Sequence, residues 1–455
     1  MRIPRIMIAA PSSGSGKTLI SCALLGAFIN KNVNIKAFKC GPDYIDPMFL
    51  KRVQGVPAEN IDLYLAGEKN MKELFLDSVQ NSKMALIEGV MGLYDGLGGI
   101  TDEASAYHIA SITRTPVILV VDAGKVGISV AALIHGFLAY DREYLIKGVI
   151  LNKISEEFYK RLKPVIEEKT GTRVLGYFPK RPELVFDSRH LGLKLPSEIE
   201  NIKDQLKLAA KQAEESIELD ALYDIADKAE ELIKEDRSLY NEIYRPQNEE
   251  LTLAIARDDA FCFYYDANIR MFEKAGIRIK YFSPLNDNKL PDDADGFILG
   301  GGYPELFLDK LEANTSMRSS IMEAINKNVP SLAECGGFMY LHRTIEKSCM
   351  VGAVNADIFK QNRLVRFGYT DIAEKSPIFL KEGQIIKAHE FHYYDSTDNG
   401  DSCIAFKASK KESRGCIHEG KEHFWGFPHL YYPSAVEFVI HFINEMKKYH
   451  DSKID

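Results

Sequence analysis

Short apolar runs, each followed by glycine or by polar side chains, recur along the chain, and helical patterns separate them. Strands that alternate with helices form mostly parallel sheets with helices on both faces, and the residues that follow the strands meet at one edge. The pattern therefore predicts an α/β fold with a doubly wound, mostly parallel sheet. The expected strands are 6–10, 33–38, 84–87, 116–121 and 147–151 in the first half, and 251–256, 277–282, 295–299 and 424–427 in the second.

The length of 455 residues predicts more than one domain, because a single core rarely grows beyond about 250 to 300 residues. Residues 197–235 are charged and carry Leu, Ile and Ala at helical spacing, whereas 237–250 are polar and lack a period. We therefore predict a first domain over 1–195, a charged helical segment and linker over 196–250, and a second domain over 251–455.

The composition is that of a globular protein and excludes several classes of partner. The net charge of −8 and the lack of a basic stripe argue against nucleic acid. No window approaches the roughly 18 apolar residues of a membrane span, and the apolar N-terminus is too short for a signal peptide. The seven cysteines are scattered without a C-x-x-C pair, which indicates reduced thiols. We expect a cytoplasmic protein without a membrane partner.

The first apolar run leads into Pro-Ser-Ser-Gly-Ser-Gly-Lys-Thr at 11–18, and a helical pattern follows. A glycine-rich loop between a strand and a helix is the context of a phosphate-binding loop. Lys17 would reach the β- and γ-phosphates, and the Thr18 hydroxyl would ligate Mg²⁺. Pro11 departs from the common pattern, which has glycine there. The residues expected to bind nucleotide are Ser13, Gly14, Ser15, Gly16, Lys17 and Thr18.

Acidic residues follow the other strands of the first half, at the edge expected to hold Lys17. Glu88 at a strand end is a natural Mg²⁺ ligand, directly or through water. A lone loop aspartate more often caps a helix or closes a turn, and that alternative stays open here. Asn152, at the end of the last of these strands, could recognise the base with its amide. The remaining candidates are Lys39, Asp43, Asp46 and Asp95.

The stretch 331–338 carries one cysteine between a short apolar run and two glycines. A strand, a tight turn and a helix in this order expose a nucleophile at the sheet edge, where backbone N–H groups can hold an oxyanion. The same pattern also fits a buried structural cysteine. A second glycine loop at 300–302 could complete the oxyanion or substrate-holding site. The candidates are Cys335 as nucleophile, with Gly300, Gly301, Gly302, Gly336 and Gly337 around it.

A cysteine nucleophile needs a base or a positive field to form its thiolate near neutral pH. His429 follows the expected strand 424–427 and would therefore also lie at the sheet edge. His389 and His392 stand in an alternating run and could equally be half-buried structural residues. Arg189 and His190 either contact an anionic substrate or cap a helix.

The Gly300–Gly302 loop, the Glu-Cys-Gly-Gly turn and a late histidine occur in the order typical of class I (triad) glutamine amidotransferases, which the second half resembles. The resemblance implies a flavodoxin-like α/β domain with Cys335 as nucleophile and His429 as general base. Typical members carry Glu two residues after this histidine, where this chain has Tyr431. The departure leaves a Cys–His dyad whose third group is missing or is supplied from elsewhere.

The whole chain resembles the cobalamin-pathway subgroup of these enzymes, whose first half is a dethiobiotin-synthetase-like ATP domain. The motifs Lys-Cys-Gly-Pro-Asp-Tyr-Ile-Asp-Pro, Glu-Gly-Val-Met-Gly-Leu-Tyr-Asp-Gly and Leu-Gly-Gly-Gly-Tyr-Pro-Glu carry this resemblance. It implies amidation of the a and c acetate carboxylates of cobyrinic acid through an acyl phosphate. ATP with Mg²⁺ and L-glutamine are the implied co-substrates. Lys39, Asp43, Asp46 and Asp95 are implied in substrate or phosphoryl handling, and Thr18 and Glu88 in holding the metal.

Alternatives remain open at this stage. The substrate could be another tetrapyrrole acid, such as hydrogenobyrinic acid or nickel-sirohydrochlorin, and a homodimer is an open possibility for the assembly. A P-loop regulatory or partition ATPase is a rival from a different class. Such a protein has no use for Cys335 and His429, so glutamine hydrolysis would discriminate between the two.

Overall fold

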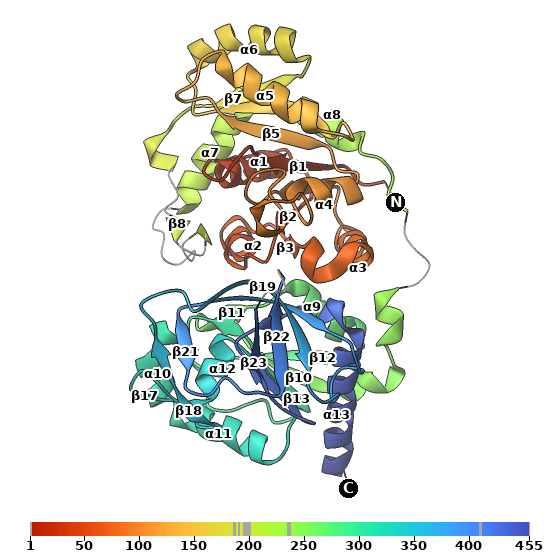
Figure 1. Ribbon diagram of the computed structural model, residues 1–455, viewed down its shortest axis with the longest axis vertical. Coiled ribbons are helices and arrows are strands. Elements are labelled where there is room, and N and C mark those ends of the chain that lie inside the picture. The colour runs from red at the N-terminus through yellow and green to blue at the C-terminus, as the bar shows by residue number, and fades with distance from the viewer. Residues whose placement is uncertain are drawn as a thin grey trace. The chain divides into compact units, whose positions relative to one another are not determined.

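The computed structural model describes residues 2–184, 188–189, 192–193, 202–233, 238–408 and 412–454. The chain divides into two compact units (Figure 1). Unit 1 comprises 1–63 and 67–236, and unit 2 comprises 64–66 and 237–455. The segment expected over 196–250 is therefore shared between the units, with the boundary at 236/237.

Unit 1 is built on a seven-stranded sheet in which every pairing is parallel. The strand order is β3-β2-β4-β1-β5-β6-β7. All five strands expected in this half are present, with ends displaced by one or two residues. β3 and β7 were not expected, because β3 is short and half polar and β7 contains a glycine. The strands are β1 (Arg5–Ala9), β2 (Ile35–Cys40), β3 (Ala58–Ile61), β4 (Met84–Glu88), β5 (Val117–Asp122), β6 (Ile146–Asn152) and β7 (Val174–Phe178).

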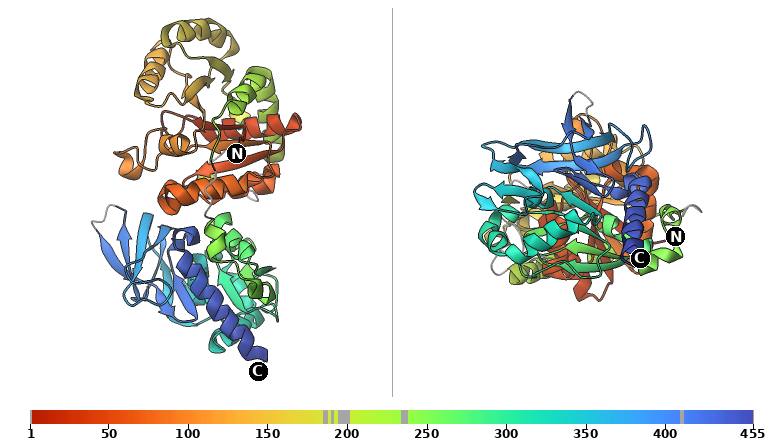
Figure 2. Two further views of the ribbon diagram at one scale, coloured as in Figure 1. Left: turned by 90° about the vertical axis from the view of Figure 1, so that its right-hand side faces the viewer. Right: turned by 90° about the horizontal axis from the view of Figure 1, so that it is seen from below.

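Helices cover both sides of this sheet (Figure 2). α1 is buried along most of its length because α7, from the charged segment, packs against it. A Cβ on Gly26 of α1 would come within 2.8 Å of the Ala210 Cβ, so a glycine there permits the close approach. The helices are α1 (Lys17–Asn30), α2 (Ile45–Phe49), α3 (Leu63–Ser78), α4 (Ala106–Ile112), α5 (Ser129–Tyr140), α6 (Glu156–Thr170), α7 (Ile202–Ser216) and α8 (Leu219–Asp227).

Unit 2 has a six-stranded sheet in the order β12-β10-β13-β15-β25-β24, parallel except for β24. β13, β15 and β25 are neighbours, so the loops that follow them start from adjacent positions on one edge. This arrangement confirms the expected strands of the second half. They are β10 (Thr252–Ala256), β12 (Arg278–Phe282), β13 (Gly296–Leu299), β15 (Ser331–Glu334), β24 (His418–Gly420) and β25 (His423–Gly426).

Further strands in unit 2 form sheets that the alternation of strands and helices does not reveal. A five-stranded sheet runs β23-β22-β19-β20-β26, and a four-stranded sheet runs β17-β16-β18-β21. Their members are β16 (His342–Ile345), β17 (Ser348–Cys349), β18 (Val354–Lys360), β19 (Arg366–Glu374), β20 (Ile386–His392), β21 (Tyr394–Ser396), β22 (Cys403–Lys407), β23 (Ser413–Cys416) and β26 (His429–Leu430). A short ladder pairs β11 (Phe261–Phe263) with β14 (Gly301–Gly302).

The helices of unit 2 are α9 (Asp266–Lys274), α10 (Leu308–Ala313), α11 (Thr315–Asn326), α12 (Gly336–Leu341) and α13 (Val436–Ile454). The core of the unit gathers side chains from β10, β13, β15, α11 and α12, and it includes Cys335. Over the residues that the structure describes, no helix has the length and apolar character needed to cross a bilayer.

Candidate active sites

The glycine-rich loop of unit 1 lies between β1 and α1, as expected. Gly14 and Gly16 have φ values of 77° and 96°, in the left-handed region that favours glycine, and Gly16 caps α1. The Lys17 ammonium donates to the carbonyl of Ser12 at 3.2 Å and to that of Met91 at 2.5 Å. The lysine is thus folded over its own loop, where phosphate oxygens could replace the two carbonyls.

A buried charge cluster adjoins this loop. Lys39 and Glu88 are direct partners across β2 and β4, and the Lys39 Nζ lies 2.7 Å from the Glu88 Oε1. The same ammonium lies 2.6 Å from the Asp46 Oδ2. The Thr18 hydroxyl donates to the Glu88 Oε1 at 2.6 Å, which links the cluster to the end of the glycine loop.

Burial and mutual charge perturb the ionisation of this cluster. Burial opposes the charge on Lys39, but Asp46 and Glu88 outweigh it and raise the pKa of Lys39 well above its usual value. Burial, with the charge of Asp46, raises the pKa of Asp43 to about 7. Burial lowers the pKa of Lys17 to about 8, against the opposing effect of Glu88. Strongly shifted pKa values among residues around a phosphate-binding loop are typical of a functional site.

Two carboxylates expected near the substrate hold backbone turns in this structure. Asp43 accepts a hydrogen bond from the Ile45 N–H at 2.8 Å, and Asp95 accepts one from the Gly92 N–H at 2.8 Å. Asp95 also raises the pKa of Lys17, which shows that its carboxylate lies close enough to interact electrostatically with the glycine loop. The contacts of Asp43 and Asp95 are therefore those of turn-forming residues.

The Asn152 side chain lies against the glycine loop. Its Nδ2 donates to the Ser15 carbonyl at 2.7 Å, and a Cβ on Gly16 would meet that nitrogen at 2.1 Å. Next to it, Lys153 pairs with Asp122 at 2.6 Å and donates to the Gly14 carbonyl at 3.2 Å. No role was predicted from the sequence for Asp122 or Lys153, although Asp122 ends β5 and Lys153 follows the neighbouring β6.

In the parts of the chain that the structure describes, no group of three or more His, Cys, Asp or Glu side chains is arranged to hold a metal ion. The Thr18 hydroxyl and the Glu88 carboxylate nevertheless present hard oxygen donors beside the phosphate loop. Mg²⁺ characteristically takes one or two protein oxygens and completes its shell with phosphate and water. The donor set therefore fits Mg²⁺ that arrives with a nucleotide.

In unit 2, Cys335 stands between β15 and α12 with φ 47° and ψ −105°, a conformation that L-residues rarely adopt. Its N–H donates to the Gly426 carbonyl of the adjacent strand end at 2.9 Å, and its own carbonyl accepts from the Met339 N–H at 2.8 Å. Strand, strained residue and helix are the arrangement of a nucleophile elbow.

Close packing brings three strand ends together around this elbow. A Cβ on Gly301 would meet the His429 Cε1 at 2.2 Å, and one on Gly336 would meet the Gly302 nitrogen at 3.1 Å. A Cβ on Gly337 would meet the Leu299 carbonyl oxygen at 2.0 Å. A side chain at any of these three positions would collide with neighbouring atoms, so glycine is required there. The same contacts bring the Gly300–Gly302 loop close to His429 and to the turn that follows Cys335.

Some of the backbone N–H groups near Cys335 are already engaged. The Gly300 N–H donates to the Tyr264 hydroxyl at 2.9 Å, and the Gly337 N–H donates to the Gly300 carbonyl at 2.9 Å. The Gly336 N–H points at the Cys335 sulfur and favours its thiolate. Gly300 and Gly337 thus join the loop to the elbow.

Both members of the Cys–His pair are uncharged at rest. Burial raises the pKa of the Cys335 thiol well above its usual value, and Glu305 raises it further. Burial lowers the pKa of His429 to about 3, with His389 and His392 adding to the effect. Burial thus disfavours the thiolate of Cys335 and the imidazolium of His429.

The two other candidate histidines lie on β20. His389 is the cross-strand partner of His429, and burial lowers its pKa to about 4. His392 stacks on Phe427 with ring centroids 4.2 Å apart, and its Nδ1 lies 2.7 Å from the Tyr394 carbonyl oxygen. Both histidines lie close enough to His429 to lower its pKa. Of the three, it is the His429 ring that packs against Gly301 of the glycine loop. Arg189 lies in β8 (Ser188–Arg189), and His190 lies outside the described residues.

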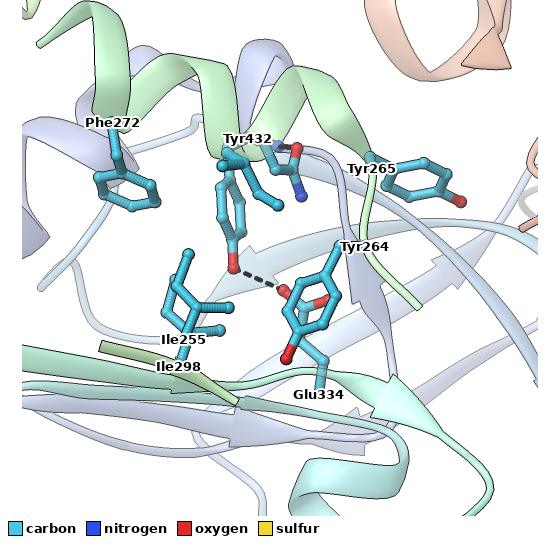
Figure 3. A pocket seen from close by; sticks show the side chains of 9 residues that line it. Ile255, Tyr264, Tyr265, Phe272, Ile298, Glu334 and Tyr432 are labelled. Carbon is cyan, nitrogen blue, oxygen red and sulfur yellow. Dashed lines mark hydrogen bonds between the residues drawn. The ribbon is translucent and has the colours of Figure 1, made fainter. Parts of the chain in front are cut away.

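No role was predicted from the sequence for Glu334, the residue directly before Cys335. Its Oε1 accepts a hydrogen bond from the Tyr432 hydroxyl at 2.7 Å (Figure 3). Its Oε2 lies 4.0 Å from the His429 Nδ1. Burial raises its pKa to about 8. Tyr431, which stands where a triad glutamate would be expected, packs instead with its ring edge against Tyr265.

Comparison with known proteins gives two family matches. Residues 6–191 match the CobQ/CobB/MinD/ParA nucleotide binding domain, and residues 252–432 match the CobB/CobQ-like glutamine amidotransferase domain. The first match contains the glycine loop and its charge cluster, and the second contains Cys335 and His429.

Several curated relatives match nearly the full length of the chain, and each is named cobyrinate a,c-diamide synthase. The protein of Caldanaerobacter subterraneus subsp. tengcongensis is 38% identical over 453 residues, covering 97% of this chain and 98% of the relative. That of Thermoplasma volcanium is 39% identical and covers 86% of each chain. That of Fusobacterium nucleatum is 38% identical over 95% of this chain and 98% of the relative.

Proposed function

The chain belongs to the cobyrinate a,c-diamide synthase family, and on that premise we propose how its two sites perform ATP- and glutamine-dependent amidation of cobyrinic acid. The substrates are ATP, glutamine and a corrin acid, and the a and c acetate carboxyls become amides. The observation that carries the proposal is the meeting of the strained Cys335, the Gly300–Gly302 loop and His429 at one sheet edge, in a chain that also carries a phosphate loop.

The second unit releases ammonia from glutamine. The Cys335 thiol gives its proton to His429, and the sulfur attacks the side-chain carbonyl carbon of glutamine. Backbone N–H groups of Gly336 and the glycine loop hold the oxyanion, and one such donor is worth roughly a hundredfold or more in rate. His429 returns the proton to the leaving nitrogen, so that ammonia departs and a thioester remains. Water then cleaves the thioester to glutamate and restores the thiol.

The first unit activates the carboxylate that will receive the ammonia. ATP bound on Gly14–Thr18 transfers its γ-phosphoryl group to a substrate carboxylate oxygen, which gives an acyl phosphate and ADP. Lys17 and Lys39 offset the charge that develops on the transferring group. Thr18 and Glu88 are the residues that would hold Mg²⁺, which neutralises phosphate charge when bound with ATP.

Ammonia then adds to the acyl phosphate, and phosphate leaves with the former carboxylate oxygen. Forming an amide from a carboxylate and ammonia is unfavourable in water, so that coupling to ATP supplies the driving force. The cycle runs once for the a side chain and once for the c side chain. The proposal places this chemistry in the cytoplasm with small-molecule partners and without nucleic acid or membrane, and a homodimer is compatible with it.

Two variants separate the half-reactions. Cys335→Ala is expected to abolish amidation from glutamine while leaving amidation from ammonium salts, because only the ammonia source is removed. Lys17→Ala is expected to lower amidation from either source by about a hundredfold or more while retaining glutamine hydrolysis. Products of cobyrinic acid with ATP and each nitrogen source are measured by mass spectrometry, and glutamate release is measured in parallel.

Loss of ammonium-dependent amidation in a folded Cys335→Ala protein would contradict two separate sites. Hydrogenobyrinic acid and nickel-sirohydrochlorin are included as rival substrates, and faster turnover of either would reassign the corrin substrate. ATP hydrolysis without glutamine hydrolysis or amide product would favour the regulatory ATPase.

A further inference from the structure

A small cavity in unit 2 is lined mainly by aromatic and aliphatic side chains and by one carboxylate (Figure 3). Tyr264, Phe272, Tyr432 and Ile298 supply apolar walls, and the carboxylate belongs to Glu334. Glu334 is only 6% exposed and lies one residue before the nucleophile. Burying a carboxylate among such neighbours is unfavourable in free energy unless the carboxylate accepts hydrogen bonds. The residues that contact Glu334 therefore indicate what the side chain does.

The carboxylate of Glu334 is bonded along the segment that carries the catalytic histidine. The Tyr432 hydroxyl donates to its Oε1 at 2.7 Å, and the Leu430 N–H also donates to the carboxylate. The Oε2 faces the His429 Nδ1 at 4.0 Å. His429, Leu430 and Tyr432, which lie within one short segment, thus all approach the same carboxylate.

We propose that Glu334 is the positioning residue for His429 and fills the role that a carboxylate two residues after the histidine would otherwise fill. When the Cys335 proton reaches the His429 Nε2, the imidazolium carries its second proton on Nδ1, toward the Glu334 Oε2. The carboxylate holds that ring orientation and stabilises the transient positive charge. The separation of 4.0 Å is an electrostatic contact and is longer than a hydrogen bond, so that a direct bond requires a small movement of one of the two side chains. The inference rests on the proposed glutaminase role of Cys335.

Other charged groups face His429, and they fit the role less well. Glu390 of β20 raises the pKa of His429, but its carboxylate is ion-paired with Arg414 and lies 3.5 Å from the His392 Nε2. His389 and His392 act in the opposite direction and lower the pKa of His429. Glu305 acts on the Cys335 thiol, whose pKa it raises.

The ionised form of Glu334 is the one that can support an imidazolium. Burial raises the pKa of Glu334, whereas the bonds from Tyr432 and Leu430 lower it, with a resulting value of about 8. The support is therefore present above that pH and is lost as pH falls through it. This gives the proposal a signature in the pH profile of glutamine hydrolysis that a purely structural role would not produce.

The test compares full-length variants by kcat/KM for glutamine hydrolysis as a function of pH, and by ammonium-dependent amidation. Glu334→Gln keeps the size of the side chain and one acceptor oxygen, removes the charge, and replaces the other oxygen with an NH2 donor. We expect it to lower kcat/KM by roughly ten- to a hundredfold and to remove the ionisation near pH 8, with ammonium-dependent amidation within twofold of the parent protein. Tyr432→Phe removes one bond to the carboxylate and should give a smaller loss that is not additive with Glu334→Gln.

Glu445→Gln serves as the matched control, since Glu445 is also buried in unit 2 but lies on α13 and bonds to Lys448. It should leave the pH profile unchanged. An unchanged pH profile of kcat/KM in a folded Glu334→Gln protein would overturn the inference. A loss of glutamine hydrolysis in Glu390→Gln but not in Glu334→Gln would also overturn it. If Cys335→Ala itself retained glutamine hydrolysis, the proposed function would fail first, and that outcome is distinguishable.

Discussion

At the scale of single residues, burial sets the charge state of both sites. Lys39 stays charged because Asp46 and Glu88 enclose it, whereas Lys17 has fewer compensating charges and a lowered pKa. Cys335 and His429 are held neutral at rest by burial. Burial thus disfavours the charged forms of both members of the proposed Cys–His pair.

The lowered pKa of Lys17 predicts a pH-dependent affinity for ATP. Burial places this pKa near 8, so the ammonium is present below that pH and is lost as pH rises through it. We expect ATP affinity to fall several-fold between about pH 7 and pH 9, because the neutral amine no longer attracts phosphate. Isothermal titration calorimetry over this range measures the change.

Two controls test whether Lys17 is responsible. Lys17→Met should bind ATP more weakly and should show no inflection over the same range. Adenosine, which lacks phosphates, should bind with little pH dependence. The same inflection in the methionine variant would assign the effect to another group.

At the scale of elements, the second site depends on backbone packing between loops. Gly301 lies on β14, His429 begins β26, and their contact leaves no space for a side chain. We expect Gly301→Ala to displace the imidazole and to lower glutamine hydrolysis by about a hundredfold, since small misplacements of catalytic groups have effects of this size. Ammonium-dependent amidation should be retained, and both rates are measured on the same preparation.

Gly136→Ala is the matched control for this substitution. Gly136 lies within α5, and a Cβ there meets no atom within 4 Å. Alanine should therefore be neutral or stabilising by up to about 1 kcal/mol. Equal loss of glutamine hydrolysis in both variants would show that the contact with His429 is not the cause.

The elements also show which features the sequence could and could not predict. The parallel strands were predictable because each combines an apolar run with a glycine or charge at its end, as 84–88 does. The short polar β3 and the antiparallel sheets of unit 2 carry no such signal. The candidates Lys17, Cys335 and His429 follow from local motifs, whereas the contacts of Glu334 with Tyr432 and His429 span 98 and 95 residues and depend on tertiary packing.

At the scale of the whole molecule, the chain combines two units with separate parallel sheets, and each sheet presents its reactive residues where strands end. Unit 1 contains the phosphate loop and the buried charge cluster around Lys39, and unit 2 contains Cys335 and His429. We propose that ammonia is the chemical link between them. The central claim is therefore that one chain takes nitrogen from glutamine and transfers it to an ATP-activated carboxylate.

The most direct test follows that nitrogen. The protein is incubated with cobyrinic acid, ATP, Mg²⁺ and glutamine labelled with ¹⁵N in its side-chain amide, and the product is analysed by mass spectrometry. The account predicts a diamide with ¹⁵N at both the a and c positions, and no labelled product from Cys335→Ala. Labelled diamide formed by Cys335→Ala, or no amidation of cobyrinic acid by the parent protein, would contradict it.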